Sequence, residues 1–164
     1  MSPDDEGYAV PKQAVQARFR LLGEEIAEGR IYLSETAQRH DGRELPSDVL
    51  NGDERFLPLA SASDDVVRLV RRRSLLWVSA PLSAEDAGAA TPVIAREDPE
   101  AASESVRIRF EDGSEVSGTL RWILPAGRRR VRDFLEHADP FFPLLAGERV
   151  TFVNRERVAS VEIA

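Results

Sequence analysis

The sequence contains no cysteine, only one lysine and only two histidines. Without cysteine the chain has no disulfide, no thiolate metal site and no cysteine nucleophile. The histidines, His40 and His137, stand at non-equivalent places. We place His40 in a turn and interpret His137 as a loop or partly buried polar residue. Arginine carries nearly all of the basic charge, which is typical of a bacterial protein from a GC-rich genome.

Recognisable catalytic motifs are also missing. The chain has no nucleophile elbow, no phosphate-binding glycine loop and no dinucleotide fingerprint. Asp48 and Asp133 recur at equivalent places, but a turn or capping role explains a repeated aspartate more simply than a catalytic pair does. We therefore expect no catalytic residues, no metal and no cofactor, and a protein that is not an enzyme.

Long apolar runs are absent. No stretch approaches the roughly 18–20 residues that a membrane span needs. Residues 1–6 lack the basic and apolar regions of a signal peptide. We expect a cytoplasmic protein without a membrane contact.

The net charge of −7 is distributed unevenly. Residues 1–13 carry −2 and residues 79–104 carry −5, while residues 14–78 and 105–164 are close to neutral at −1 and +1. Non-specific nucleic-acid binding usually needs a clustered basic face. This charge distribution does not favour it.

What the chain does contain is an internal repeat. Residues 48–59 and 133–144 align without a gap, from an Asp-apolar-Leu triplet to a Phe-apolar-Pro-Leu segment. The flanking segments match as well. We predict a tail at 1–13, a first barrel at 14–79, an acidic Ala- and Pro-rich linker at 80–104 and a second barrel at 105–164. Copies of this size are near the lower limit for a stable core, so we expect them to pack on each other or on other subunits.

Each copy shows the two-residue alternation of half-buried strands, broken by glycine-marked turns. Asp112-Gly113 predicts a hairpin in the second copy, and Gly29 and Gly118 each predict a bend inside a strand. We predict a final hairpin at 66–78 and its twin at 149–163. The Asp-apolar-Leu triplet fits either a capped helical turn or the end of a bent third strand.

Five short strands per copy and no long helix predict a mainly all-β protein of two tandem small five-stranded antiparallel barrels with short helical turns. Residues 106–120 resemble the first signature of Sm-like (LSm) proteins, with a strand, an Asp-Gly turn and a glycine-bent second strand. Residues 148–161 resemble the second signature. The resemblance covers most of the second copy and, more faintly, the first, and other SH3-like barrels share the pattern.

The resemblance implies candidate contacts, because Sm-like proteins form rings that bind RNA through the third-strand loop and the turn of the last hairpin. Here those loops hold residues 133–139, and Asn154 with Arg155. The family's Arg-Gly is Asn154-Arg155 in this chain, and the loop asparagine is absent near Asp133. The two arginine clusters could also grip phosphate. These clusters are Arg71, Arg72 and Arg73, and Arg128, Arg129, Arg130 and Arg132.

Two kinds of function remain open from the residues. Exposed strand edges favour a protein-interaction or regulatory scaffold that binds a protein partner or associates with itself. The alternative is RNA or nucleotide binding through the arginine clusters and hairpin loops. Acidic residues near both clusters also fit a simpler role in solvated or interfacial salt bridges.

Overall fold

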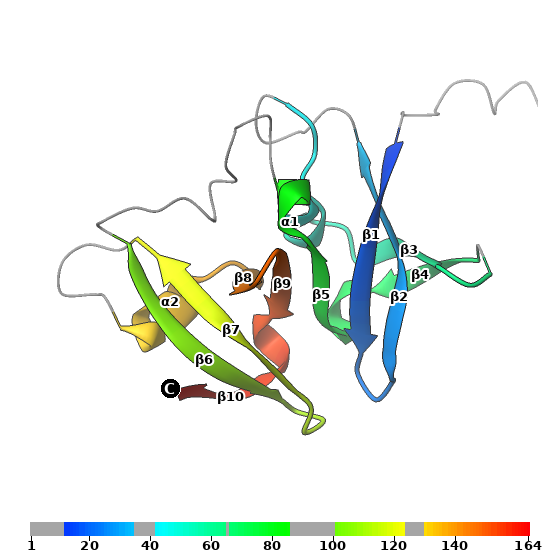
Figure 1. Cartoon of the computed structure of the whole chain (residues 1–164). Helices are drawn as coiled ribbons and strands as arrows, with labels where there is room; N and C mark the ends of the chain where they lie inside the picture. The colour runs from blue at the N-terminus through cyan, green and yellow to red at the C-terminus, as the bar shows by residue number, and fades with distance from the viewer. Residues whose placement is uncertain (1–11, 35–41, 65, 86–100, 124–129) are drawn as a thin grey trace, which may run out of the picture.

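The computed structural model describes residues 12–34, 42–64, 66–85, 101–123 and 130–164 (Figure 1). Most of the predicted tail and linker lies outside these ranges. No helix in the described ranges has the length and apolar character that a membrane crossing requires.

Ten strands and several short helices make up the described chain. The strands are β1 (Lys12–Leu21), β2 (Ile26–Ser34), β3 (Phe56–Ser61), β4 (Val67–Arg71), β5 (Leu75–Pro81), β6 (Ala102–Phe110), β7 (Glu115–Trp122), β8 (Phe141–Ala146), β9 (Arg149–Asn154) and β10 (Val158–Ile163). The α-helices are α1 (Pro46–Leu50) and α2 (Val131–His137), and the 3-10 helices are η2 (Arg72–Ser74), η3 (Leu82–Glu85) and η5 (Arg155–Arg157). The prediction of a mainly β protein with short helical turns is confirmed.

The strands form one antiparallel sheet in the order β10-β6-β7-β8-β9-β5-β1-β2-β3-β4. The first five strands therefore occupy one side and the last five the other, with the same succession in each group. The two groups meet at β5 and β9, in the middle of the molecule (Figure 1). The finer prediction of two five-stranded barrels is not confirmed, because the sheet is continuous and not closed.

The predicted final hairpins are wrong. β4 and β5 follow each other in sequence, but β4 pairs with β3 while β5 pairs with β1 and β9. The second group repeats this arrangement, with β9 on β8 and β10 on β6. In both places a 3-10 turn redirects the chain, η2 in the first group and η5 in the second.

The two Asp-apolar-Leu triplets are helical. Asp48 lies inside α1 rather than at its N-cap, and its carboxylate accepts a hydrogen bond from the Leu45 backbone N–H at 2.8 Å. Pro46 opens this helix, where the missing N–H of proline costs nothing. Asp133 lies in the first turn of α2. A carboxylate in the first turn is favourable because the helix N-terminus is partly positive.

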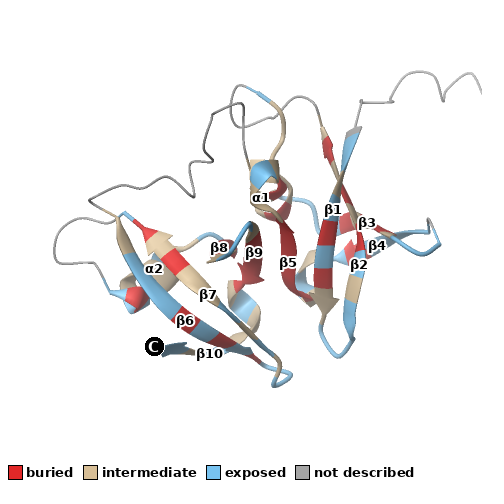
Figure 2. Ribbon diagram, viewed as in Figure 1, coloured by how far each residue is buried: buried red, intermediate tan, exposed pale blue. Residues whose placement is uncertain are grey.

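Two apolar clusters form the core, and each crosses between the groups of strands. The first gathers around β1 to β5 but takes in Phe141, Val150 and Phe152 from the second group. The second gathers around β6 to β9 but takes in Leu76 and Trp77 from β5. Buried residues accordingly fill β5 and β9 along nearly their whole length (Figure 2).

Gly29 and Gly118, for which the sequence predicted a bend inside the strand, lie where neighbouring strands approach closely. A Cβ on Gly118 would lie 2.5 Å from the Leu145 backbone oxygen and 2.7 Å from Cγ of Leu144. A Cβ on Gly29 would meet the Ala60 backbone oxygen. Glycine thus lets β2 lie against β3, and β7 against β8, at these points.

Candidate functional site

The two groups of strands are joined by the strand pair β5–β9. β5 and β9 run antiparallel, with Trp77 opposite Val153, Val78 opposite Phe152 and so on to Pro81 opposite Arg149. Ser79 and Thr151 face each other in the middle of this pair, and both are buried. The junction therefore has the burial of a core strand pair.

Side-chain amides fasten the same junction. Asn51, just after α1, accepts from the Phe141 N–H at 2.8 Å and donates to the Phe141 carbonyl at 3.1 Å. Asn154, at the end of β9, donates to the Leu75 carbonyl at 2.8 Å. Each amide bonds a backbone group of the opposite group of strands, so the two groups are joined by side-chain hydrogen bonds as well as by the β5–β9 pair.

The sheet leaves two strands with an unpaired edge, β4 at one end and β10 at the other. In β4 the backbone groups of alternate residues bond to β3, as shown by Ser61 N–H to the Val66 carbonyl at 3.1 Å and Arg72 N–H to the Arg55 carbonyl at 2.8 Å. Because hydrogen-bonded pairs alternate in antiparallel strands, the groups of Val67 and Leu69 point outward.

The same reasoning applies to β10. The Ala164 N–H donates to the Ser105 carbonyl at 3.0 Å, so Ala164 and Glu162 direct their backbone groups toward β6. Val161 and Ile163 then point theirs outward. Both free edges carry unpaired donors and acceptors of the kind that another strand can satisfy.

The β4 end also exposes large apolar side chains. Leu69 is 71% exposed and Phe56 is 46% exposed. In the second group the position of Leu69 is held by Phe152, because Leu69 lies opposite Pro58 and Phe152 lies opposite Pro143. The position of Phe56, at the start of β3, is held by Phe141, at the start of β8. Yet Phe152 and Phe141 are each only 1% exposed, since the first group of strands covers them. The β4 end thus presents positions that are buried in the other group.

Two of the predicted contact residues, Asn154 and Arg155, lie against the protein itself. The Asn154 side chain accepts from the Glu156 N–H at 3.2 Å besides its bond to Leu75. The Arg155 guanidinium donates to the carbonyls of Leu135 at 3.4 Å and Ala138 at 2.5 Å, at the end of α2. These bonds give both side chains a structural role, and their contact with RNA stays a prediction.

The first arginine cluster lies around a cavity of about 560 Å³ beside β4. Arg71 stacks over the Phe56 ring at 5.6 Å from its centroid. Arg72 reaches back to α1, where it donates to the Val49 carbonyl at 3.2 Å. The cavity lining is Asp53, Glu54, Arg55, Phe56, Arg71, Arg72 and Arg73. This is one place where the structure gathers predicted site residues.

The second cluster is described only in part. Arg128 and Arg129 lie outside the described residues. Arg130 is exposed at the N-cap of α2, and Arg132 forms an exposed ion pair with Glu136, one helical turn on, at 3.1 Å.

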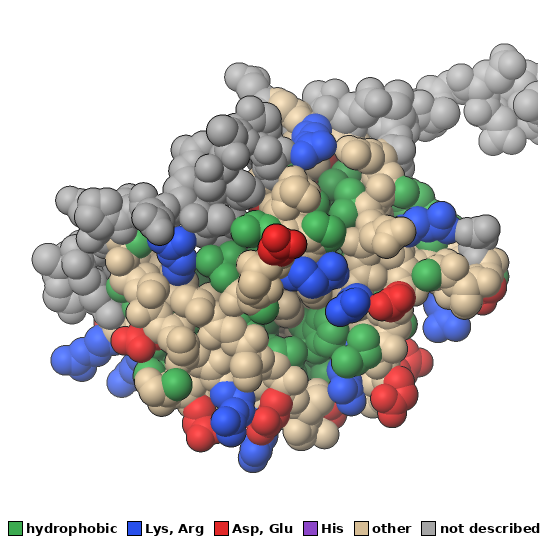
Figure 3. All heavy atoms as spheres, in the orientation of Figure 1, with side chains coloured by type: hydrophobic (Ala, Val, Ile, Leu, Met, Phe, Trp, Pro, Cys, Tyr) green, Lys and Arg blue, Asp and Glu red, His purple; other side chains and the backbone are tan. Residues whose placement is uncertain are grey.

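Across the face shown in Figure 3, basic and acidic side chains are interspersed along the lower rim.

The described residues contain no group of three or more His, Cys, Asp or Glu side chains that could hold a metal ion. Comparisons of the chain with protein families, with curated proteins and with solved structures found no match.

Sequence reasoning missed the residues that distinguish the two sheet ends. Leu69 reads as an ordinary inward residue of an alternating strand, and Asn51 reads as a loop residue. The alignment of the two copies did indicate that this position suits burial, because Phe152 in the second copy and Leu69 in the first are both large and apolar. Only the strand order reveals that one is covered and the other is open.

Proposed function

We propose that this protein is a non-catalytic interaction scaffold of two Sm-like barrels, and that it assembles head to tail with further copies of itself. The β4 edge of one chain pairs with the β10 edge of the next. The observation that carries the proposal is the internal junction, where the fifth strand of the first group pairs with the fourth strand of the second. The strands left open are the fourth of the first group and the fifth of the second.

The internal junction supplies a register for the pairing between chains. Ala17 pairs with Gly29 as Val106 pairs with Gly118, and this sets Val161 of β10 at the position of Val78 in β5. Leu69 of β4 holds the position of Phe152 in β9. Since Val78 lies opposite Phe152, the transferred register sets Val161 opposite Leu69.

Two independent features of the edges support this register. The pairs that it brings together, Val161 with Leu69 and Ile163 with Val67, are residues whose backbone groups point outward on both strands. Between these two pairs the register sets Glu162 opposite Arg68. At the internal junction the same place holds the neutral pair Ser79 and Thr151. Opposite charges facing each other across strands stabilise a sheet pair.

The burial pattern supports the same partner. At the internal junction the first group covers Phe141, Val150 and Phe152. An incoming chain would cover the corresponding Phe56, Val67 and Leu69 with its own second group of strands. Such a contact joins two different surfaces, so repeated pairing yields a closed ring or an open filament rather than a two-fold dimer.

Reversing the charge pair tests this assembly. We expect Arg68→Glu to raise the dissociation constant of self-association about tenfold, since like charges then face each other across the strands. Combining it with Glu162→Arg should restore association. Sedimentation velocity over a wide range of concentration measures both effects. Glu162 also lies 3.5 Å from Arg107 in its own chain, so recovery in the double variant is the decisive readout.

Arg132→Glu is the matched control, because Arg132 is an exposed, ion-paired arginine away from both edges. A wild-type protein that stays at the 18.2 kDa of one chain at every concentration would refute the proposal. Association that is indifferent to Arg68→Glu would leave self-assembly standing but would refute this edge and register.

A second candidate function is RNA or nucleotide binding at the cavity beside β4. It is favoured by one observation, the gathering of Arg55 and the three clustered arginines around the half-exposed Phe56 ring. Aromatic rings and guanidinium planes both stack on bases, and guanidinium groups hold phosphate. Asp53 and Glu54 in the same wall weaken the attraction.

A fluorescence-polarisation titration with a mixed-sequence oligoribonucleotide checks this second function at low and moderate salt. If it is correct, we expect saturable binding that weakens with salt and falls at least about tenfold in Arg73→Gln. Arg73 is chosen because it is exposed and, among the described residues, its side chain forms a long ion pair of 4.0 Å with Glu156. An absence of binding at low salt would exclude this function.

A further inference from the structure

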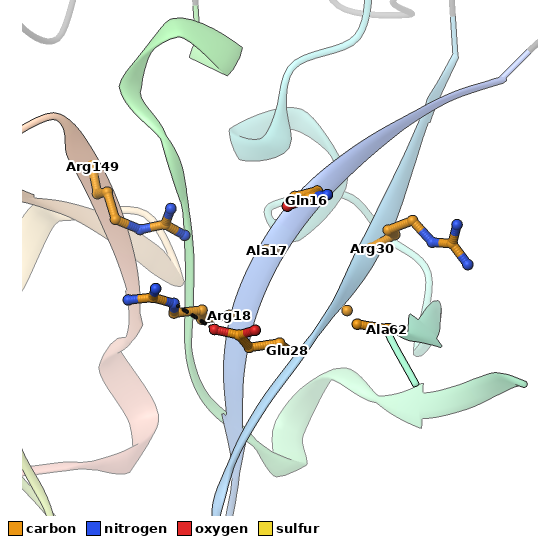
Figure 4. Close-up of a pocket in the computed structure, with 8 residues that line it drawn as sticks. Gln16, Ala17, Arg18, Glu28, Arg30, Ala62 and Arg149 are labelled. Atoms are coloured by element: carbon orange, nitrogen blue, oxygen red, sulfur yellow. Dashed lines mark hydrogen bonds and ion pairs between the residues drawn. The ribbon is translucent and has the colours of Figure 1, made fainter. Parts of the chain in front are cut away.

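A second arginine-lined cavity lies at the junction of the two groups of strands, away from the sheet edges. Its volume is about 410 Å³. β1 contributes Arg18, β2 contributes Glu28 and Arg30, and β9 contributes Arg149. Figure 4 shows Arg149 and Arg18 reaching from β9 and β1 into the same space over β5, with Arg30 on the other side of β1.

Arg18 and Arg149 share a lining that holds a single carboxylate. Glu28 is the one acidic residue in the lining, and it is paired with Arg18 at 3.1 Å. Arg149 is instead held by neutral partners, because its Nε donates to Ser79 Oγ at 2.9 Å and its terminal nitrogen donates to the Ser79 carbonyl at 3.0 Å. No carboxylate in the described chain lies within ion-pair distance of Arg149.

The electrostatics of Arg149 reflect this arrangement. Partial burial lowers the pKa of its guanidinium, and the positive charge of Arg18 lowers it further, while Glu28 offsets only part of the effect. An arginine nevertheless stays protonated at neutral pH. The cavity thus holds the positive charges of Arg18 and Arg149. Glu28 pairs with Arg18, while Ser79, being neutral, leaves the charge of Arg149 unbalanced.

We infer that this cavity binds a small anion that bears a phosphate group, held between Arg18 and Arg149. Guanidinium groups bind phosphate through paired, charge-assisted hydrogen bonds, and two of them converge here from different strands. Ser79 orients the Arg149 guanidinium through two hydrogen bonds, and the exposed Arg18 guanidinium pairs with Glu28 beside it.

The site belongs to the internal junction and requires no assembly. Val67 in β4 holds the position of Val150 in β9. The residue before Val150 is Arg149, whereas the residue before Val67 is Val66, so the β4 edge has a valine in place of this arginine. A contact between chains would therefore bring no second arginine to meet Arg107, which holds the position of Arg18. We therefore expect one anion per chain, whatever the state of assembly.

Isothermal titration calorimetry with inorganic phosphate on the full chain tests the site. We expect saturable binding of one phosphate per chain at millimolar or lower concentration. Arg149→Gln and Arg18→Gln should each raise the dissociation constant at least about tenfold, because each removes a charge-assisted contact. Arg132→Gln, which removes an exposed arginine elsewhere, should leave binding unchanged.

Two further arms keep the test decisive. Adenosine monophosphate and acetate distinguish a phosphomonoester from free phosphate and from a carboxylate, and tighter binding of acetate would overturn the choice of phosphate. Arg149→Gln also loses the contacts to Ser79, so its fold is checked by circular dichroism. If Arg149→Gln unfolds, Arg18→Gln decides the test, because Arg18 is exposed. Absence of saturable heat in the wild type, or equal binding by Arg18→Gln, refutes the site.

Discussion

Leu69→Asp is expected to leave the protein monomeric. Leu69 is the most exposed of the large apolar residues in the described chain, and its counterpart Phe152 is among the most buried. In the proposed assembly Leu69 lies opposite Val161 of the next chain, inside an apolar contact. Burying one leucine contributes about 1.5–3 kcal/mol, and an unpaired carboxylate in its place adds a desolvation cost. The dissociation constant should therefore rise at least about a hundredfold.

Light scattering coupled to size exclusion measures this directly. The wild type should give multiples of the 18.2 kDa chain, and Leu69→Asp should give one chain. Ile26→Asp is the matched control, since Ile26 is also a well-exposed apolar residue but lies at the hairpin between β1 and β2. If Ile26→Asp dissociates the protein equally, general surface hydrophobicity rather than the β4 edge drives association.

Adding a single methyl group at Gly118 is expected to destabilise the fold severely. The Cβ of alanine would lie 2.5 Å from the Leu145 oxygen and 2.7 Å from Leu144 Cγ, well inside van der Waals contact. The Leu145 oxygen is backbone and Leu144 is fully buried, so neither can retreat without moving β8. Overpacking of a core costs about 1–3 kcal/mol, and a backbone clash places this variant at or beyond the upper end.

Thermal unfolding by circular dichroism checks the Gly118→Ala variant. For a chain of this size, about 3 kcal/mol corresponds to a fall in Tm of roughly 6–12 °C. Gly29→Ala should behave alike, because its Cβ would meet the Ala60 backbone oxygen. Gly113→Asn is the control, since Gly113 has a φ of 85° and open space around it, and asparagine tolerates that conformation. A wild-type Tm in Gly118→Ala would mean that β7 and β8 do not lie this close.

The sequence predicted several local elements correctly. Alternation placed β1 and β2, and the Asp112-Gly113 turn placed the hairpin of β6 and β7. These features depend on residues that are neighbours along the chain. The Asp-apolar-Leu triplets remained ambiguous because a helix as short as α1 has too few residues to show a helical period.

The candidate sites were harder to predict because they depend on contacts between distant segments. Asn154 and Arg155 read as a polar turn open to solvent, but α2 and β5 bring carbonyl groups to their side chains. Arg18 and Arg149 are far apart in sequence and carry no motif. They share a cavity only because β1 and β9 both flank β5.

The sequence by itself predicted the alternating strands and the Asp112-Gly113 turn, since these follow from the local period of apolar residues and from glycine. Only the tertiary structure decided how the strands outside the β1–β2 and β6–β7 hairpins pair. The predicted hairpin of β4 and β5 was a reasonable reading of neighbouring runs, yet β5 lies between β1 and β9. Strand pairing is decided by which edges can share hydrogen bonds and bury apolar faces together. That choice, which leaves β4 and β10 open, depends on the whole sheet.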